Sequence, residues 1–182
     1  SIDLKRDANP QVVLNQLYTY TQLQTTFGVI MLAIVNGEPK ILNLKEMLVN
    51  YIDFQEEVIT RRTSFDLNKA QERMHILEGL KIALDNIDEV IATIRASKDT
   101  GDAVHNLMEK FALTEIQAQA IVQMRLRQLT GLEREKIEDE IRELGIKIAD
   151  YKEILASKER RMQIIKDEAI EIRNKYGDER RT

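Results

Sequence analysis

Proline constrains this chain more than any other residue type, because it is nearly absent. The 182-residue sequence contains only Pro10 and Pro39, so nothing after residue 39 is proline. An average usage of about 5% would place roughly seven prolines in that stretch. Proline interrupts helices because it lacks a backbone donor and clashes with the preceding turn. With only seven glycines in the whole chain, the segment is predicted to form long helices.

The composition narrows the class of protein. Charged residues make up 32% of the chain and aromatic residues 5%, which is typical of a thin core spread along helices. The net charge of −4 excludes a uniformly basic protein that coats nucleic acid, so any DNA contact must be local. The absence of cysteine excludes a disulfide framework and a thiol nucleophile. Without a long apolar run or a signal-peptide pattern, we expect a soluble, cytoplasmic protein with no membrane contact.

The first 44 residues carry few charges and differ from the rest of the chain. Asn9 and Pro10 predict an N-cap and the first position of a helix that ends at Phe27. The apolar, β-branched run 29–35 and the segment 40–42 then predict a hairpin joined by a four-residue turn. A lone two-stranded hairpin is only marginally stable, so these residues are expected to be the edge of a larger domain.

The next two regions differ in texture. Asn43 can cap a helix that begins at Leu44 and runs to about Asp85, either as one helix or as two joined by a slight bend. Residues 87–131 are more apolar and predict a compact knob of short helices. These helices are expected at about 87–97, 100–111 and 114–128, the last beginning with a capping-box pattern at Thr114.

Two apolar seams have complementary spacing. One follows the first long helix and the other follows the charged segment after residue 132. The seam residues are Leu67, Ala70, Met74 and Leu77 on the first, and Ile137, Ile141, Leu144 and Ile148 on the second. In an antiparallel pair, this spacing places Leu77 beside Ile137 and Met74 beside Ile141.

The predicted fold class is therefore mainly α. Residues 45–86 and 132–176 form a long antiparallel two-helix coiled-coil arm, with a possible interruption at Ser157. The knob, residues 87–131, lies at its tip, and residues 177–182 form a linker. A short N-terminal helix and a β-hairpin complete the chain.

Five blocks carry a specific resemblance. They are residues 60–67 (TRRTSFDL), 75–80 (HILEGL), 86–91 (NIDEVI), 124–133 (MRLRQLTGLE) and 176–182 (YGDERRT). In content and order they resemble the A subunits of bacterial type IIA DNA topoisomerases, in particular those of DNA gyrase, with topoisomerase IV as the alternative.

The resemblance implies a place in a larger enzyme. Residues 1–44 would be the last part of its tower domain, and the arm would be its coiled coil. The knob would be the exit gate, where two subunits meet and a transported DNA duplex leaves during ATP-dependent supercoiling. The implied partners are a second copy of the chain, duplex DNA and the gyrase B subunit.

The resemblance also implies that the chemistry lies elsewhere. The family's catalytic tyrosine lies on a winged helix that would precede residue 1, and none of the five tyrosines here matches its motif. Mg²⁺ and ATP belong to the B subunit, whereas the present sequence contains no phosphate-binding G-x-x-x-x-G-K-[ST] loop. We therefore expect no catalytic, cofactor or metal site in this chain and no activity of the chain alone.

The candidate functional surface is apolar and lies in the knob. It consists of Met108, Phe111, Leu113, Met124, Leu126 and Leu129. These side chains could all be interior. A knob of about 45 residues has limited capacity to bury them, so we expect some of them at a subunit interface, where adaptable methionine suits a contact that opens and closes.

Several polar residues admit two interpretations. His75 and His105 could bind a metal, but each stands alone, which favours a structural or solvated histidine. The acidic run 138–140 could be a metal cluster or, as we favour, a solvated helix face. The arginines at 61–62 could contact DNA phosphate or, as we favour, form ion pairs. Those at 180–181 could belong to a linker or face DNA.

Two function classes remain open on the residues alone. The first is the structural, dimerising part of a DNA topoisomerase, and the second is a generic coiled-coil scaffold. Composition and heptads support both equally. The block resemblance separates them, together with the N-terminal hairpin, which a simple scaffold does not need.

Overall fold

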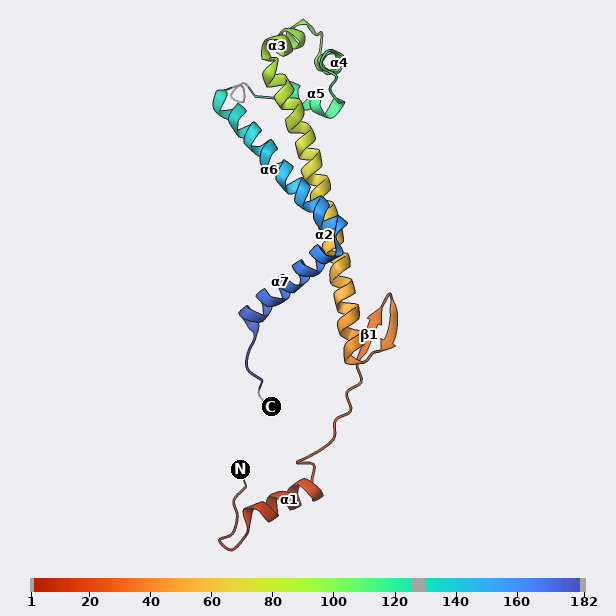
Figure 1. Ribbon diagram of the computed structural model, residues 1–182, viewed down its shortest axis with the longest axis vertical. Coiled ribbons are helices and arrows are strands. Elements are labelled where there is room, and N and C mark those ends of the chain that lie inside the picture. The colour runs from red at the N-terminus through yellow and green to blue at the C-terminus, as the bar shows by residue number, and fades with distance from the viewer. Residues whose placement is uncertain (1, 126–129, 181–182) are drawn as a thin grey trace. The chain divides into compact units, whose positions relative to one another are not determined.

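The computed structural model describes residues 2–125 and 130–180 of the chain (Figure 1). Most of these residues are helical, which confirms the predicted fold class. The chain divides into two compact units, Ser1–Asn50 and Tyr51–Thr182, which are treated separately below. Across the described residues, no helix combines the length and apolar character that crossing a membrane requires.

Helix α1 (Pro10–Tyr20) begins as predicted but ends early. The Asn9 side chain accepts a hydrogen bond from the Gln11 N–H at 3.0 Å, which satisfies one of the free donors at the helix start. The predicted end at Phe27 is wrong. Thr21 adopts an extended backbone and its hydroxyl donates to the Leu17 carbonyl, a local bond that competes with continuation of the helix.

The hairpin pairs β1 (Leu32–Val35) with β2 (Glu38–Ile41) in antiparallel order. Its turn has two residues, Asn36 and Gly37, with φ values of 53° and 83°. Two consecutive positive φ values are typical of the type I′ turn that matches strand twist. The predicted four-residue turn is therefore wrong, and Pro39 lies within a strand, where a two-stranded sheet tolerates its missing donor.

Helix α2 (Leu44–Asp85) is a single helix of 42 residues, so the one-helix alternative is correct. Its start is a reciprocal capping box. Asn43 Oδ1 accepts from the Glu46 N–H at 2.9 Å, and the Asn43 N–H donates to Glu46 Oε2 at 2.8 Å. Each bond gives a partner to a backbone N–H at the start of the helix that would otherwise have none.

The knob contains α3 (Ile87–Ala96), α4 (Thr100–Phe111) and α5 (Glu115–Val122). Figure 1 shows these short helices gathered at the end of α2. The first two match their predicted ranges closely, whereas α5 ends at Val122 and not near residue 128. The Met124 N–H donates to the Ile121 carbonyl, three residues back. Such a 3₁₀-type bond is common at the end of an α-helix.

The arm is completed by α6 (Gly131–Ala156) and α7 (Lys158–Tyr176). The predicted interruption at Ser157 is confirmed, because this residue ends one helix and starts the next. Its N–H donates to the Glu153 carbonyl, and its hydroxyl accepts from the Arg160 N–H at 3.2 Å.

Ion pairs link α2 and α6 in antiparallel order. Asp85, at the end of α2, pairs with Arg134, near the start of α6. Earlier in α2, Arg73 pairs with Glu140, later in α6, at 2.7 Å. Of the eight seam residues, Ala70 and Leu77 are buried and the other six are half-buried. The side-by-side pairs along the seam stay a prediction.

Candidate functional site

The knob has its own hydrophobic core. The buried members come from α2, α3, α4, α5 and the link between the last two. They are Ala83, Val90, Leu107, Leu113, Ala118 and Ile121. Leu107 and Ala118 are fully inaccessible. Ala83 belongs to this core and Leu80 packs against it. The C-terminal end of α2 is therefore part of the knob.

Four of the six candidate interface residues meet at this core. Met108, Phe111 and Met124 are partly buried and pack against it. Leu113 is 6% exposed and belongs to the core itself, so it has little surface left for a partner. The remaining two, Leu126 and Leu129, lie outside the described residues. The interface role of this set stays a prediction.

The knob also exposes apolar side chains that were not among the predicted interface residues. Ile116 in α5 is 60% exposed, and Ile91 in α3 is 38% exposed. Ile116 directly precedes the buried Gln117 and Ala118. Helical periodicity was the available signal, because a residue just outside the buried stripe of 117, 118 and 121 points away from the core.

A polar network joins the knob to the arm. His75 Nε2 on α2 lies 2.7 Å from Thr114 Oγ1, the N-cap of α5. The Gln117 side chain donates to the His75 carbonyl at 2.7 Å and accepts from the Thr114 N–H at 3.0 Å. The predicted capping box at Thr114 is therefore confirmed, and its members bind α2. His75 is a structural residue, which is the interpretation that its isolation in the sequence favoured.

Gly79 allows this close approach. It is buried within α2, and a Cβ atom added there would lie 2.7 Å from the Cβ of Gln117. His75 and Gly79 are four residues apart and so share one face of the helix. An isolated glycine in a strong helical pattern is the sequence signal that could have indicated this contact.

The acidic run 138–140 separates into three ion pairs. Glu138 pairs with Arg134 and Asp139 with Arg142, at 3.6 Å and 3.0 Å respectively, while Glu140 pairs with α2. Different partners hold these carboxylates apart, as a solvated face requires. In the part of the chain that the structure describes, no three metal-ligating side chains form a group.

The remaining basic and histidine candidates are also accounted for where they are described. Arg61 pairs with Glu57 at 3.7 Å, and Arg62 with Glu168 at 2.8 Å, which is the ion-pair interpretation. His105 is exposed and lies 3.3 Å from a glutamate on its own helix. Arg180 is exposed, and Arg181 lies outside the described residues.

The least exposed ion pair of the arm joins α2 and α7. Glu56 accepts from Arg161 Nε at 3.1 Å and Nη2 at 2.9 Å, and the two side chains are 18% and 15% exposed. Lys158 adds a second cation at 3.6 Å. The hydrogen bonds from Arg161 hold the pKa of Glu56 below its ordinary value, against the opposing effect of burial.

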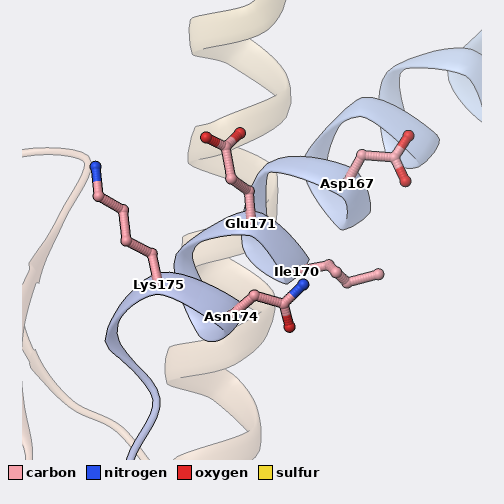
Figure 2. A pocket seen from close by; sticks show the side chains of 5 residues that line it. All are labelled: Asp167, Ile170, Glu171, Asn174 and Lys175. Carbon is pink, nitrogen blue, oxygen red and sulfur yellow. The ribbon is translucent and has the colours of Figure 1, made fainter.

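A shallow depression on α7 offers no comparable arrangement. It is lined by Asp167, Ile170, Glu171, Asn174 and Lys175. Figure 2 shows Asp167, Ile170 and Asn174 extending to one side of the helix and Glu171 and Lys175 extending elsewhere, so that the polar ends do not meet at one point. A binding site requires polar groups that converge on a ligand, so this depression carries no functional assignment.

Comparison with known proteins decides the family. The family model for the A subunits of DNA gyrase and topoisomerase IV matches residues 1–169. The chain belongs to this A-subunit family. The resemblance predicted from the five blocks is thereby confirmed.

Several relatives within this family are named as the A subunits of DNA gyrases. That of Clostridium acetobutylicum is 60% identical over 181 residues, and those of Staphylococcus epidermidis and Staphylococcus aureus are 56% and 55% identical. Each match covers all of this chain but only 20–22% of the relative. The chain therefore spans about a fifth of the length of these relatives.

Proposed function

We propose that this chain is the arm and dimerising exit gate of the A subunit of a DNA gyrase, through which a transported duplex leaves during ATP-dependent supercoiling. The observation that supports this most is the structure of the knob. It has a closed core and still exposes Ile116 and Ile91, whereas ion pairs join the helices of the arm. Exposed apolar side chains beside a rigid core suit a subunit contact.

Symmetry adds a requirement. A homodimer with a two-fold axis must use the same patch on both subunits. The knob suits this, because Met108 and Met124 lie at the rim of its core and are only partly buried. Flexible methionine side chains adapt to a contact that must open and close repeatedly.

The other partners follow from the family and are part of the proposal. We place the catalytic tyrosine outside this chain, and Mg²⁺ and ATP on the gyrase B subunit. The chain alone then forms no covalent DNA adduct. Its net charge of −4 makes its affinity for duplex DNA weak and steeply dependent on salt.

Sedimentation equilibrium tests the gate. The chain should be dimeric at tens of micromolar, and Met124→Glu should shift it to monomer with helix content unchanged. Because Met124 also contacts the core, Ile116→Glu provides a second knob variant at an exposed position. Ile146→Glu, which changes a 68% exposed residue on α6, is the matched arm control and should leave the dimer intact.

Two outcomes would contradict the gate. A wild-type chain that stays monomeric at these concentrations removes the dimerising role. A dimer that survives both knob changes but dissociates in the α6 control moves the interface to the arm. The matching family model also includes topoisomerase IV, the second candidate. In the complete enzyme, supercoiling without strong decatenation supports gyrase, and the reverse supports topoisomerase IV.

A further inference from the structure

Helix α7 is built as a separate piece of the arm. Ser157 provides its N-cap and also ends α6, so the two helices share no backbone hydrogen-bond ladder across the break. None of its nineteen residues, all of which the structure describes, is fully buried. By contrast, α2 buries seven residues along its length. Elements with few buried contacts open most readily.

Two reciprocal ion pairs hold α7 on α2. Each helix supplies one arginine and one glutamate. Arg161 of α7 binds Glu56 with two donors, and Arg62 of α2 donates to Glu168 at 2.8 Å. The first pair is largely shielded from water, so its hydrogen bonds are screened less than those of surface pairs.

Arg161 also joins the break itself. Its Nη1 donates to the carbonyls of Ile154 and Leu155, at 3.1 Å and 2.8 Å. These are among the last carbonyls of α6, which have no partner within their own helix. One guanidinium therefore contacts α2 and the end of α6 from its position in α7. Loss of Glu56 would leave the contacts at the break in place while releasing the contact with α2.

The apolar contact between α7 and α2 is incomplete. Side chains of both helices line a gap of about 50 Å³, among them Tyr51 and Gln55 of α2 and Ile165 and Ala169 of α7. Tyr51 is 58% exposed, and so is Ile172 on the same gap. Apolar burial at this gap therefore adds little. Ile59 of α2, between Glu56 and Arg62, is 1% exposed, and the charged pairs lie on either side of it.

We propose that α7 is a releasable strap of the arm, hinged at Ser157 and latched on α2 by the Glu56–Arg161 and Arg62–Glu168 pairs. Release lets the arm bend at the break without disturbing the knob or the pairing of α2 with α6. This device is independent of dimerisation, and its readouts do not depend on oligomeric state.

Hydrogen exchange on the intact chain tests the latch. Glu56→Gln should speed exchange of the α7 amides by about tenfold, as expected for loss of charged hydrogen bonds. The amides of α6 and of the knob should change less than about twofold. Glu57→Gln is the matched control. It removes the same charge at the adjacent position, where the glutamate pairs with Arg61 on its own helix. It should leave α7 unchanged.

A distance measurement distinguishes release of α7 from α2 from local opening of the hydrogen bonds within α7. The chain contains no cysteine, so a spin-label pair at Asp53 and Asn174 reports on α2 and α7 alone. Glu56→Gln should lengthen and broaden this distance. A pair at Glu72 and Glu143 should report no change between α2 and α6. Unchanged exchange in Glu56→Gln, equal acceleration in the knob, or an unaltered α2–α7 distance would each overturn the proposal.

Discussion

The knob and the arm are held together by different forces. The knob packs Leu107 and Ala118 with no exposed surface and fastens its rim with uncharged hydrogen bonds around Gln117. In the arm, α6 buries only Ile154 among its 26 residues, and ion pairs connect its helices. The knob therefore depends on close packing, and the arm depends on a thin seam and on charge.

This difference predicts different responses to change. A closed core responds strongly to lost volume and weakly to salt or pH. Exposed and half-buried ion pairs respond to salt and to carboxyl protonation but tolerate small losses of apolar area. A knob that keeps its shape while the arm adjusts suits the gate that we propose.

Core truncation gives the largest expected contrast. Leu107→Ala should lower the free energy of unfolding by about 2–5 kcal/mol, because the residue is fully buried and leaves a cavity. Leu144→Ala, at a half-buried seam position of α6, should cost about 1 kcal/mol, because less apolar area is lost. Urea unfolding followed by circular dichroism measures both.

Ile116→Ala is the control for this comparison. It truncates a knob residue that is 60% exposed, so it should change stability by less than about 0.5 kcal/mol. Equal costs for Leu107→Ala and Leu144→Ala would show that the arm is packed as tightly as the knob and would remove the contrast.

Features with a local cause could be predicted from the sequence. The predicted caps at Asn9, Asn43 and Thr114 each depend on a side chain and a backbone group a few residues away, and the predicted interruption at Ser157 has a local cause of the same kind. A single sequence shows both partners of such contacts. Long helices likewise follow from the missing proline and from helical spacing.

Helix ends without a strong local signal were predicted less well. Both α1 and α5 end before their predicted limits, at Tyr20 and Val122. The sequence has no proline or glycine within several residues after either point. Helix propensity alone therefore allowed both helices to continue. Thr21 adopts an extended backbone, which ends α1. Gln123 keeps a right-handed helical backbone, and α5 ends where the Met124 N–H bonds to the Ile121 carbonyl, three residues back.

The site divides in the same way. Residue type identified Met108, Phe111 and Met124 as apolar knob residues for a core or an interface, and the structure packs them against one core. Residue type could not show that Leu113 is interior, since core and interface select the same side chains. The contact of Gln117 with His75 joins residues 42 positions apart. Gly79 could indicate a close approach to this part of α2, but no local pattern identifies Gln117 as the partner.

Two glycines in helix interiors sharpen the comparison with opposite signs. Gly79→Ala should lower stability by about 1–3 kcal/mol, because the new Cβ would collide with Gln117. Gly145→Ala in α6 should raise stability by about 0.5–1 kcal/mol, because alanine favours a helix and Met74 is 4.0 Å from the new atom. Thermal and urea unfolding of both variants provide the measurement.

Each glycine variant is a control for the other, because both changes add one methyl group to the interior of an α-helix. If both variants are stabilised, α5 shifts on α2 at little cost, and the junction is not tightly packed. If Gly145→Ala is destabilising, the arm has less room between α2 and α6 than the structure shows.

The smallest expected effect concerns the Arg73–Glu140 ion pair. The hydrogen bond from Arg73 holds the pKa of Glu140 below its ordinary value, although burial opposes this. The pair therefore stabilises the fold above the ordinary carboxyl pKa, and that contribution is lost as the pH falls through the lowered value. Since the side chains are 50% and 40% exposed, solvent screening limits it to about 0.2–1 kcal/mol.

A double-mutant cycle with Arg73→Met and Glu140→Gln isolates this coupling at pH 7 and again near pH 3. The coupling should shrink at the lower pH and in molar salt, because protonation and screening both weaken it. Arg142 and Asp139 provide the comparison, since this pair lies within α6 and is 72% and 63% exposed. A single-helix pair of that exposure contributes less than about 0.5 kcal/mol. A larger coupling for Arg142–Asp139 than for Arg73–Glu140 would mean that the Arg73–Glu140 pair does not hold α2 and α6 together.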